Sequence, residues 1–78
     1  MKIEFDPAKR QLTLTHRGLD LARAGEIFDG PTMTVADDRK DYGETRFISI
    51  GELDESMAVV VWTPRAATRH IISLRTRQ

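Results

Sequence analysis

The sequence contains no cysteine and no long apolar run, and its charges cancel. Without cysteine, neither disulfides nor thiolate metal ligands can stabilise the chain, which fits a reducing compartment. No stretch approaches the roughly 20 apolar residues that a membrane-spanning helix needs. The first residues reach an acid at Glu4, so they do not form a signal peptide. We therefore expect a cytoplasmic protein that does not associate with a membrane.

The charged residues are balanced in number but unevenly distributed. Twelve basic residues match twelve acidic ones, which argues against a nucleic-acid binder that relies on net charge alone. Acids predominate between residues 37 and 55, whereas residues 64–78 contain several arginines and no acid. A chain of this kind can still present one basic face, so its net charge does not exclude RNA as a ligand.

The length of 78 residues predicts a single domain, residues 1–78. Alternation of polar and apolar residues over Lys2–Phe5 predicts a short strand. Asp6 and Pro7 then favour the start of a helix that ends at Gly18. Residues 12–15 alternate like a strand, so a hairpin over residues 3–15 is the alternative to this helix. We favour the helix.

The rest of the chain predicts one more helix and then four strands. Asp20 favours a helix that ends at Asp29, and apolar runs predict strands at residues 33–36, 46–50, 57–63 and 68–74. The run Val59–Val61 predicts a central strand buried on both faces. A turn is expected over Pro64–Ala67. Short connections favour an antiparallel meander, so we expect an α+β fold with two N-terminal helices packed on a small, mostly antiparallel sheet.

Five segments carry a resemblance to a known family. The first is an aromatic residue followed by Asp-Pro-x-Lys, at residues 5–9, and the second is a glycine that leads into the second helix, at residues 18–29. The other three are strand motifs at residues 44–51, 59–63 and 69–75. In this order and spacing they resemble the BrnT family, the ribonuclease toxins of bacterial type II toxin–antitoxin systems. The resemblance covers nearly the whole chain. It implies a RelE-like fold and RNA cleavage that uses neither a metal nor another cofactor.

The resemblance also implies partners for the chain. These are an RNA substrate and a BrnA-type antitoxin, which neutralises the toxin and, in the complex, represses the operon through DNA. Relatives continue after the last strand with a polar helix, whereas this sequence stops at Gln78. A sheet surface left bare by a missing helix favours a homodimer. The alternative to an active toxin is therefore a shortened, non-catalytic module that only pairs with an antitoxin or with itself.

Cleavage of RNA by its own 2′-hydroxyl needs a base, an acid and cations around the phosphate. The candidates for catalysis are Arg46 for the phosphate, His70 or His16 as acid or base, and Glu44 as a base or orienting group. The candidates for RNA binding are Lys9, Arg69, Arg75 and Arg77.

Each candidate also has a structural interpretation. His70 could be a core residue whose ring nitrogens have hydrogen-bond partners, and His16 could stabilise the end of a helix. Glu44 could simply form an ion pair with Arg46. Strand alternation groups His70 with Ile72 and Leu74 on one face and Arg69 with Ile71 and Ser73 on the other. Arg69 and His70 can therefore face one site only if the strand is bulged. No histidine pair has the spacing of a metal site.

Overall fold

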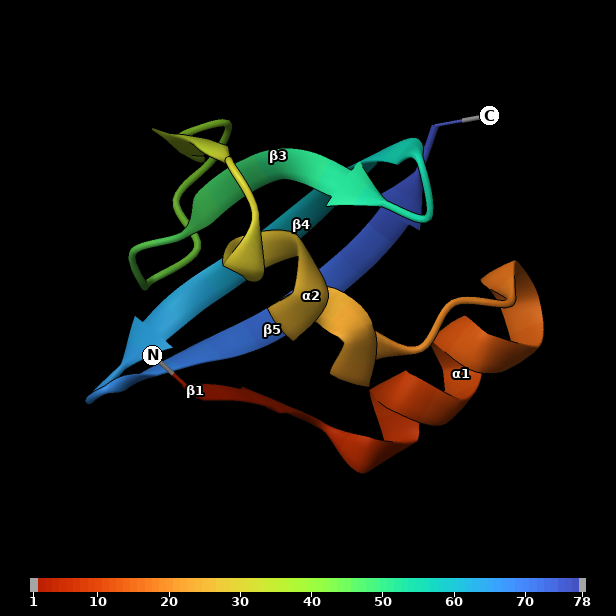
Figure 1. Ribbon diagram of the computed structural model, residues 1–78. Coiled ribbons are helices and arrows are strands. Elements are labelled where there is room, and N and C mark those ends of the chain that lie inside the picture. Colours follow the sequence, from red (N-terminus) through yellow and green to blue (C-terminus); the bar gives the residue numbers. More distant parts are fainter. Residues whose placement is uncertain (1, 78) are drawn as a thin grey trace.

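The computed structural model describes residues 2–77 and has the expected α+β architecture (Figure 1). The helical elements are α1 (Pro7–Arg17), the short 3₁₀ helix η1 (Leu21–Arg23) and α2 (Ala24–Asp29). The strands are β1 (Lys2–Phe5), β2 (Met33–Ala36), β3 (Phe47–Leu53), β4 (Ser56–Arg65) and β5 (Thr68–Thr76). The helix over residues 7–17 is confirmed and the alternative hairpin is not formed. None of the helices in this part of the chain has the length and apolar character to cross a membrane.

The five strands form one sheet in the order β1-β5-β4-β3-β2. Strands β2 to β5 follow one another as the predicted antiparallel meander. The first strand, β1, then pairs in parallel with the last strand, β5. The two helices therefore do not open the chain, because β1 precedes both of them. Strand β4 lies in the middle of the sheet, as the Val59–Val61 run predicts.

Local signals in the sequence set the ends of the helices. The Asp6 carboxylate accepts a hydrogen bond from the Ala8 backbone N–H, which caps α1. Gly18 ends α1 in a left-handed conformation (φ 68°), and its N–H donates to the Leu14 carbonyl. Asp20 caps the second helical segment as expected, but that segment begins as the 3₁₀ turn η1.

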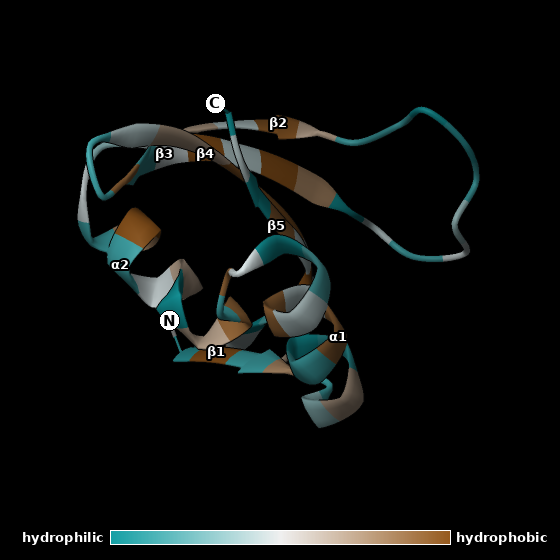
Figure 2. Cartoon of the chain, turned by 90° about the vertical axis from the view of Figure 1, so that its right-hand side faces the viewer, coloured by the Kyte–Doolittle hydropathy of each residue, from teal (hydrophilic) through white to brown (hydrophobic). Residues whose placement is uncertain are grey.

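The core lies between one face of the sheet and the η1–α2 segment, over which the sheet curves in Figure 2. The buried apolar side chains come from η1, α2 and three strands: Leu21, Ala24, Ile27, Leu53, Ala58, Val60, Trp62, Ile71 and Leu74. We call this side of the sheet the helix face. The approach is close at Gly51, where an added Cβ would lie 2.7 Å from the Ile27 Cγ2 atom. Glycine at this position therefore allows α2 to pack this closely against β3.

The opposite side of the sheet, which we call the open face, is also apolar. By strand register it carries Met33 and Val35 of β2, Ile48 and Ile50 of β3, and Met57, Val59 and Val61 of β4. All of these side chains are exposed or half-buried. The prediction that the valine run is buried on both faces is therefore wrong, because α2 covers one face only.

A hydrogen-bond chain joins three strands on the helix face of the sheet. The Trp62 indole N–H donates to the Ser49 hydroxyl over 2.8 Å. That hydroxyl lies 2.7 Å from the Thr34 hydroxyl of β2. Ser49 is fully buried, so these contacts satisfy a polar group that water cannot reach.

A β-bulge changes the alternation along β5. Trp62 pairs with Ile71, whereas the preceding Val61 pairs with Ser73, so Ile72 is an extra residue in β5. Beyond the bulge, Leu74 pairs with Val60 and is buried on the helix face. The grouping of Leu74 with His70 and of Ser73 with Ile71 is therefore wrong, because strict alternation assumes a strand without an extra residue.

The strand ends also differ from the predicted ones. Strand β4 continues through Pro64 to Arg65, which pairs with Thr68, so the turn contains only Ala66 and Ala67. Ala66 adopts a left-handed conformation with φ 52°. Strands β3 and β5 extend beyond their predicted ends, to Leu53 and Thr76.

The segment that joins β2 to β3 is fixed by one buried carboxylate. The Asp37 side chain has no exposed surface and receives two hydrogen bonds from the Arg39 guanidinium, at 2.7 and 2.8 Å. The Arg39 side chain and backbone N–H lower the pKa of Asp37 to about 2 from an ordinary value of 3.8. In Figure 2 the rest of this loop projects away from the sheet.

We expect Ser49→Ala to destabilise the fold by about 1–3 kcal/mol, because it leaves the buried Trp62 N–H without an acceptor. Urea unfolding of the wild-type chain and the variant measures this loss. In a Trp62→Phe background, which has no indole N–H, the same substitution should cost less. An equal cost in both backgrounds would show that the hydrogen bond contributes nothing.

We expect the stability to fall in acid through Asp37. A carboxylate with a lowered pKa stabilises the fold above its unfolded pKa, near 3.8, and this contribution is lost as pH falls towards about 2. Asp37→Asn should therefore lower the stability at pH 6 and lose less of it between pH 6 and pH 3. Thermal unfolding at the two pH values tests this, and parallel losses in both proteins would contradict it.

Candidate functional site

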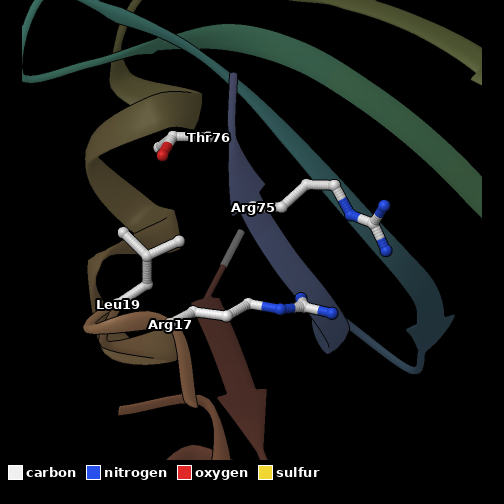
Figure 3. Close-up of a pocket in the computed structure, with 4 residues that line it drawn as sticks. All are labelled: Arg17, Leu19, Arg75 and Thr76. Atoms are coloured by element: carbon white, nitrogen blue, oxygen red, sulfur yellow. The ribbon is translucent and has the colours of Figure 1, made fainter. Parts of the chain in front are cut away.

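Two adjoining hollows of about 290 and 220 Å³ lie between α1 and β5 and share Arg17 in their walls. The first is lined by Arg17, Leu19, Arg75 and Thr76, and the second by Lys9, Leu12, Thr13, His16, Arg17 and Ser73. We call the two together the α1–β5 groove. In Figure 3 the Arg17 and Arg75 side chains extend in the same direction past β5, and Leu19 and Thr76 lie on the other side of the strand.

Helix α1 is held beside β5 by Arg17 itself. The Arg17 guanidinium donates a 3.0 Å hydrogen bond to the Leu74 carbonyl. His16 and Arg17 occupy the last turn of α1, where the helix dipole favours positive charge. From β5, Ser73 and Arg75 point to the open face, since they pair with Val61 and Val59. The groove therefore takes its cations from two segments far apart in sequence.

The cations of the groove have no acidic neighbours within the described part of the chain. Among residues 2–77, no carboxylate lies within 4.0 Å of Lys9, His16, Arg17 or Arg75. Arg10, also on α1, behaves differently because both of its hydrogen bonds go to Asp20 at 2.8 Å. That contact, with the Ala22 N–H, lowers the pKa of Asp20 to about 2. The groove thus keeps unpaired positive charge that suits an anion.

A second group of sequence candidates lies at the other end of the open face. Arg46 donates a hydrogen bond to Glu44 at 2.9 Å, and its guanidinium stacks 4.0 Å from the centre of the Tyr42 ring. Arg46 directly precedes Phe47, which pairs with Trp62, so alternation places Arg46 on the open face. The ion pair expected between Arg46 and Glu44 is present.

His70 belongs to the same end of the sheet. Its register partners are Thr63 on β4 and Glu4 on β1, and its Nδ1 atom lies 3.2 Å from a Glu4 carboxylate oxygen. The Thr63 hydroxyl donates to the Thr45 carbonyl at 2.6 Å, which connects this row to the start of β3. The structure therefore brings His70 to the same face and end of the sheet as Arg46. The histidine is half-buried beside a carboxylate and is not part of the apolar core.

Arg69 lies on the opposite side of β5 from His70. Its guanidinium stacks 4.1 Å from the Phe28 ring centre and 5.0 Å from that of Trp62. The bulge at Ile72 lies beyond this pair, so it does not bring Arg69 and His70 to one face. Arg69 is thus held against the core by aromatic rings.

The structure therefore divides the sequence candidates into three places. Lys9, His16 and Arg75 line the α1–β5 groove, and exposed Arg77 follows the end of β5. Arg46, Glu44 and His70 lie at the far end of the open face, and Arg69 lies under α2.

Sequence reasoning did not identify Arg17 or Ser73, which also line the groove. The signal for Arg17 was the basic last turn of α1, but its contact with β5 depends on the folded chain. Within residues 2–77, no cluster of three or more histidine, aspartate or glutamate side chains could hold a metal ion.

Comparison with known proteins supports the resemblance drawn from the sequence. No curated protein matches the chain. Among protein families, residues 5–78 match the ribonuclease toxin, BrnT, of type II toxin–antitoxin systems. That match spans nearly all of the chain and includes α1, η1, α2 and strands β2 to β5, whereas β1 enters it only at Phe5. The chain therefore belongs to the BrnT family of ribonuclease toxins.

Proposed function

We propose that the chain is an endoribonuclease that cleaves RNA without a metal and is neutralised by a cognate BrnA-type antitoxin. The observation that carries the proposal is the α1–β5 groove. It joins a histidine to three cations that have no acidic neighbour within residues 2–77. An RNA backbone offers the negative charge that such a groove suits.

The proposed reaction uses the RNA as its own nucleophile. A base takes the proton of the 2′-hydroxyl, whose oxygen attacks the adjacent phosphorus, and an acid protonates the departing 5′ oxygen. The products are a 2′,3′-cyclic phosphate and a free 5′-hydroxyl. Arginines stabilise the charge that builds on the phosphate oxygens, because their planar fork matches two oxygens at once. Arg17 and Arg75 occupy that role in the groove, with Lys9 and Arg77 as further RNA contacts.

Two histidines compete for the acid and base roles. His16 lies among the groove cations, where a bound phosphate would be nearest. His70 lies beside Glu4 at the Arg46 end, where a carboxylate can orient its ring. We assign the principal role to His16, because its position beside unpaired cations couples proton transfer to phosphate binding. Arg46 and Glu44 then contact the RNA farther along the open face.

The proposal includes the partners that the family suggests. An antitoxin would hold the toxin inactive in the cytoplasm, and the complex, not the toxin alone, would bind operator DNA. The toxin itself would form a homodimer. The second candidate function is a non-catalytic module that only binds a partner, which the uncovered open face favours.

We expect Arg17→Gln and Arg75→Gln each to lower the RNA cleavage rate by about a hundredfold, since each removes a cation from the charged phosphate. Arg65→Gln is the matched control, because Arg65 is an exposed arginine in the β4–β5 hairpin, away from the groove. Single-stranded RNA with a labelled 5′ end measures the rate and identifies the cyclic-phosphate product. Equal losses in all three variants would refute the groove as the site.

We expect His16→Gln to lower cleavage by about 10²–10⁴-fold and to remove one limb of the pH profile. His70→Gln serves as the comparison and should keep both limbs. If His70→Gln lowers the cleavage rate more than His16→Gln does, the reaction centre lies at the end of the open face that carries Arg46. If the folded wild-type chain leaves RNA intact, the binding-module interpretation is correct and the ribonuclease proposal fails.

A further inference from the structure

The open face of the sheet carries a continuous apolar surface. Two rows of side chains cross it from β4 through β3 to β2, and they consist of Val59, Ile50 and Met33, and of Val61, Ile48 and Val35. Met57 extends the surface beside the first row. All of these side chains are exposed or half-buried, whereas η1 and α2 close the helix face. An apolar sheet face of this kind suits a second packed layer, which a partner would supply.

The size of the apolar surface matches one α-helix. Three adjacent strands, β2 to β4, span about 10 Å, because neighbouring strands lie about 4.8 Å apart. An α-helix with its side chains is about 10–12 Å wide. Along β4 the surface runs from Met57 to Val61, which is about 13 Å at the rise of a strand residue. A helix covers that length in about two and a half turns.

The residue types favour a protein helix over RNA as the ligand of this surface. Its side chains are aliphatic or methionine, whereas proteins that bind single-stranded RNA stack the bases on aromatic rings. Phe28, Phe47 and Trp62 pack together on the helix face, and Tyr42 lies against Arg46 at the far end. Amphipathic helices dock their apolar side chains on aliphatic surfaces, where flexible methionines adapt to the ligand.

Cations border the apolar surface on its β5 side. Arg75 pairs with Val59 and so continues the first apolar row, and Ser73, in the groove wall beside Arg17, continues the second. Exposed Arg77 lies next to Met57, whose carbonyl accepts its backbone N–H at 2.9 Å. Strand β2, on the other side, carries no charge. A helix that complements this surface therefore has acidic residues along the flank that faces β5 and an uncharged flank over β2.

A second copy of the chain does not supply such a helix. Helix α1 contains basic residues and no acid, and the apolar side of α2 is buried in its own core. Glu52 is the only acidic residue in β2 to β5, so a second sheet also lacks the acids that the β5 side requires. Complementary charge therefore selects a helix from a different protein.

We propose that an amphipathic helix of the antitoxin packs on the open face, with its apolar side chains on the two rows and its acidic flank on Arg75 and Arg17. The inference rests on the proposed function for the identity of the partner, and it adds the surface and the chemistry of recognition. Arg75 and Arg17 are also the proposed phosphate ligands. One helix would therefore cover the apolar surface and occupy the cations that RNA needs, so binding alone would neutralise the toxin.

The first test concerns the apolar rows, and its probe is the antitoxin encoded beside the toxin gene. The double variant Met33→Gln, Val35→Asn removes two exposed apolar side chains without changing the charge. The control is Ala67→Gln, an exposed position in the β4–β5 turn. Surface plasmon resonance should show affinity for the antitoxin at least about tenfold weaker in the double variant and unchanged in the control. Circular dichroism verifies that each variant is folded.

The second test concerns the charged flank. Arg75→Glu and the control Arg65→Glu change the net charge equally, but Arg65 lies in the β4–β5 hairpin, away from the groove. We expect Arg75→Glu to weaken antitoxin binding at least about tenfold in about 0.1 M salt and less in about 1 M salt, because salt screens exposed charges. Arg65→Glu should have little effect in either.

Full affinity of the double variant, or equal losses in Arg75→Glu and Arg65→Glu, would overturn the proposal. A free wild-type dimer that the double variant dissociates would assign the open face to a second copy instead. Weaker binding of single-stranded RNA by the double variant would assign it to RNA. An antitoxin that does not bind the wild-type chain would refute the partner in the proposed function as well. Since no measurement depends on RNA cleavage, the ribonuclease proposal can fail while this one stands.

Discussion

The fold depends on the position of one indole ring. Trp62 lies in the middle strand and meets Phe28 of α2 nearly edge-on, with ring centres 5.9 Å apart. Its ring centre lies 5.0 Å from that of Phe47 on β3, and its N–H donates to Ser49. Arg69 of β5 covers the ring from the helix face. One side chain of β4 therefore contacts α2, β3 and β5. Its buried N–H needs a hydrogen-bond acceptor, which the Ser49 hydroxyl supplies.

Ion pairs and aromatic contacts engage some of the arginines and leave others without an acidic neighbour. Arg10 and Arg39 each share two hydrogen bonds with a single carboxylate, and Arg69 is stacked on aromatic rings. Arg17 and Arg75, in contrast, have no carboxylate within 4.0 Å among the described residues. Because the chain has zero net charge, any positive potential near it comes from the local separation of paired and unpaired cations.

Much of the fold could be predicted because its signals are local. Asp6, Pro7 and Gly18 mark the ends of α1 through hydrogen bonds and backbone conformations that span only a few residues. The bulge at Ile72 could not be predicted, because it arises from how β5 pairs with β4 and no residue type marks it. One extra residue is enough to move Leu74 into the core and Ser73 out to the groove.

The candidate site was less predictable, since residue types indicate chemistry but not proximity. The sequence identified His16 and Arg75 separately, and only the fold shows that Arg17 joins them by bonding to the Leu74 carbonyl 57 residues away. The order of the strands places β1 and β5 towards one edge of the sheet and β2 at the other, and the two edges differ in charge and in apolar exposure. Unpaired cations gather beside β5, whereas β2 exposes apolar side chains and free backbone groups. Within residues 2–77, the cations without acidic neighbours therefore lie towards one edge of the sheet, and the exposed apolar side chains of β2 lie at the other.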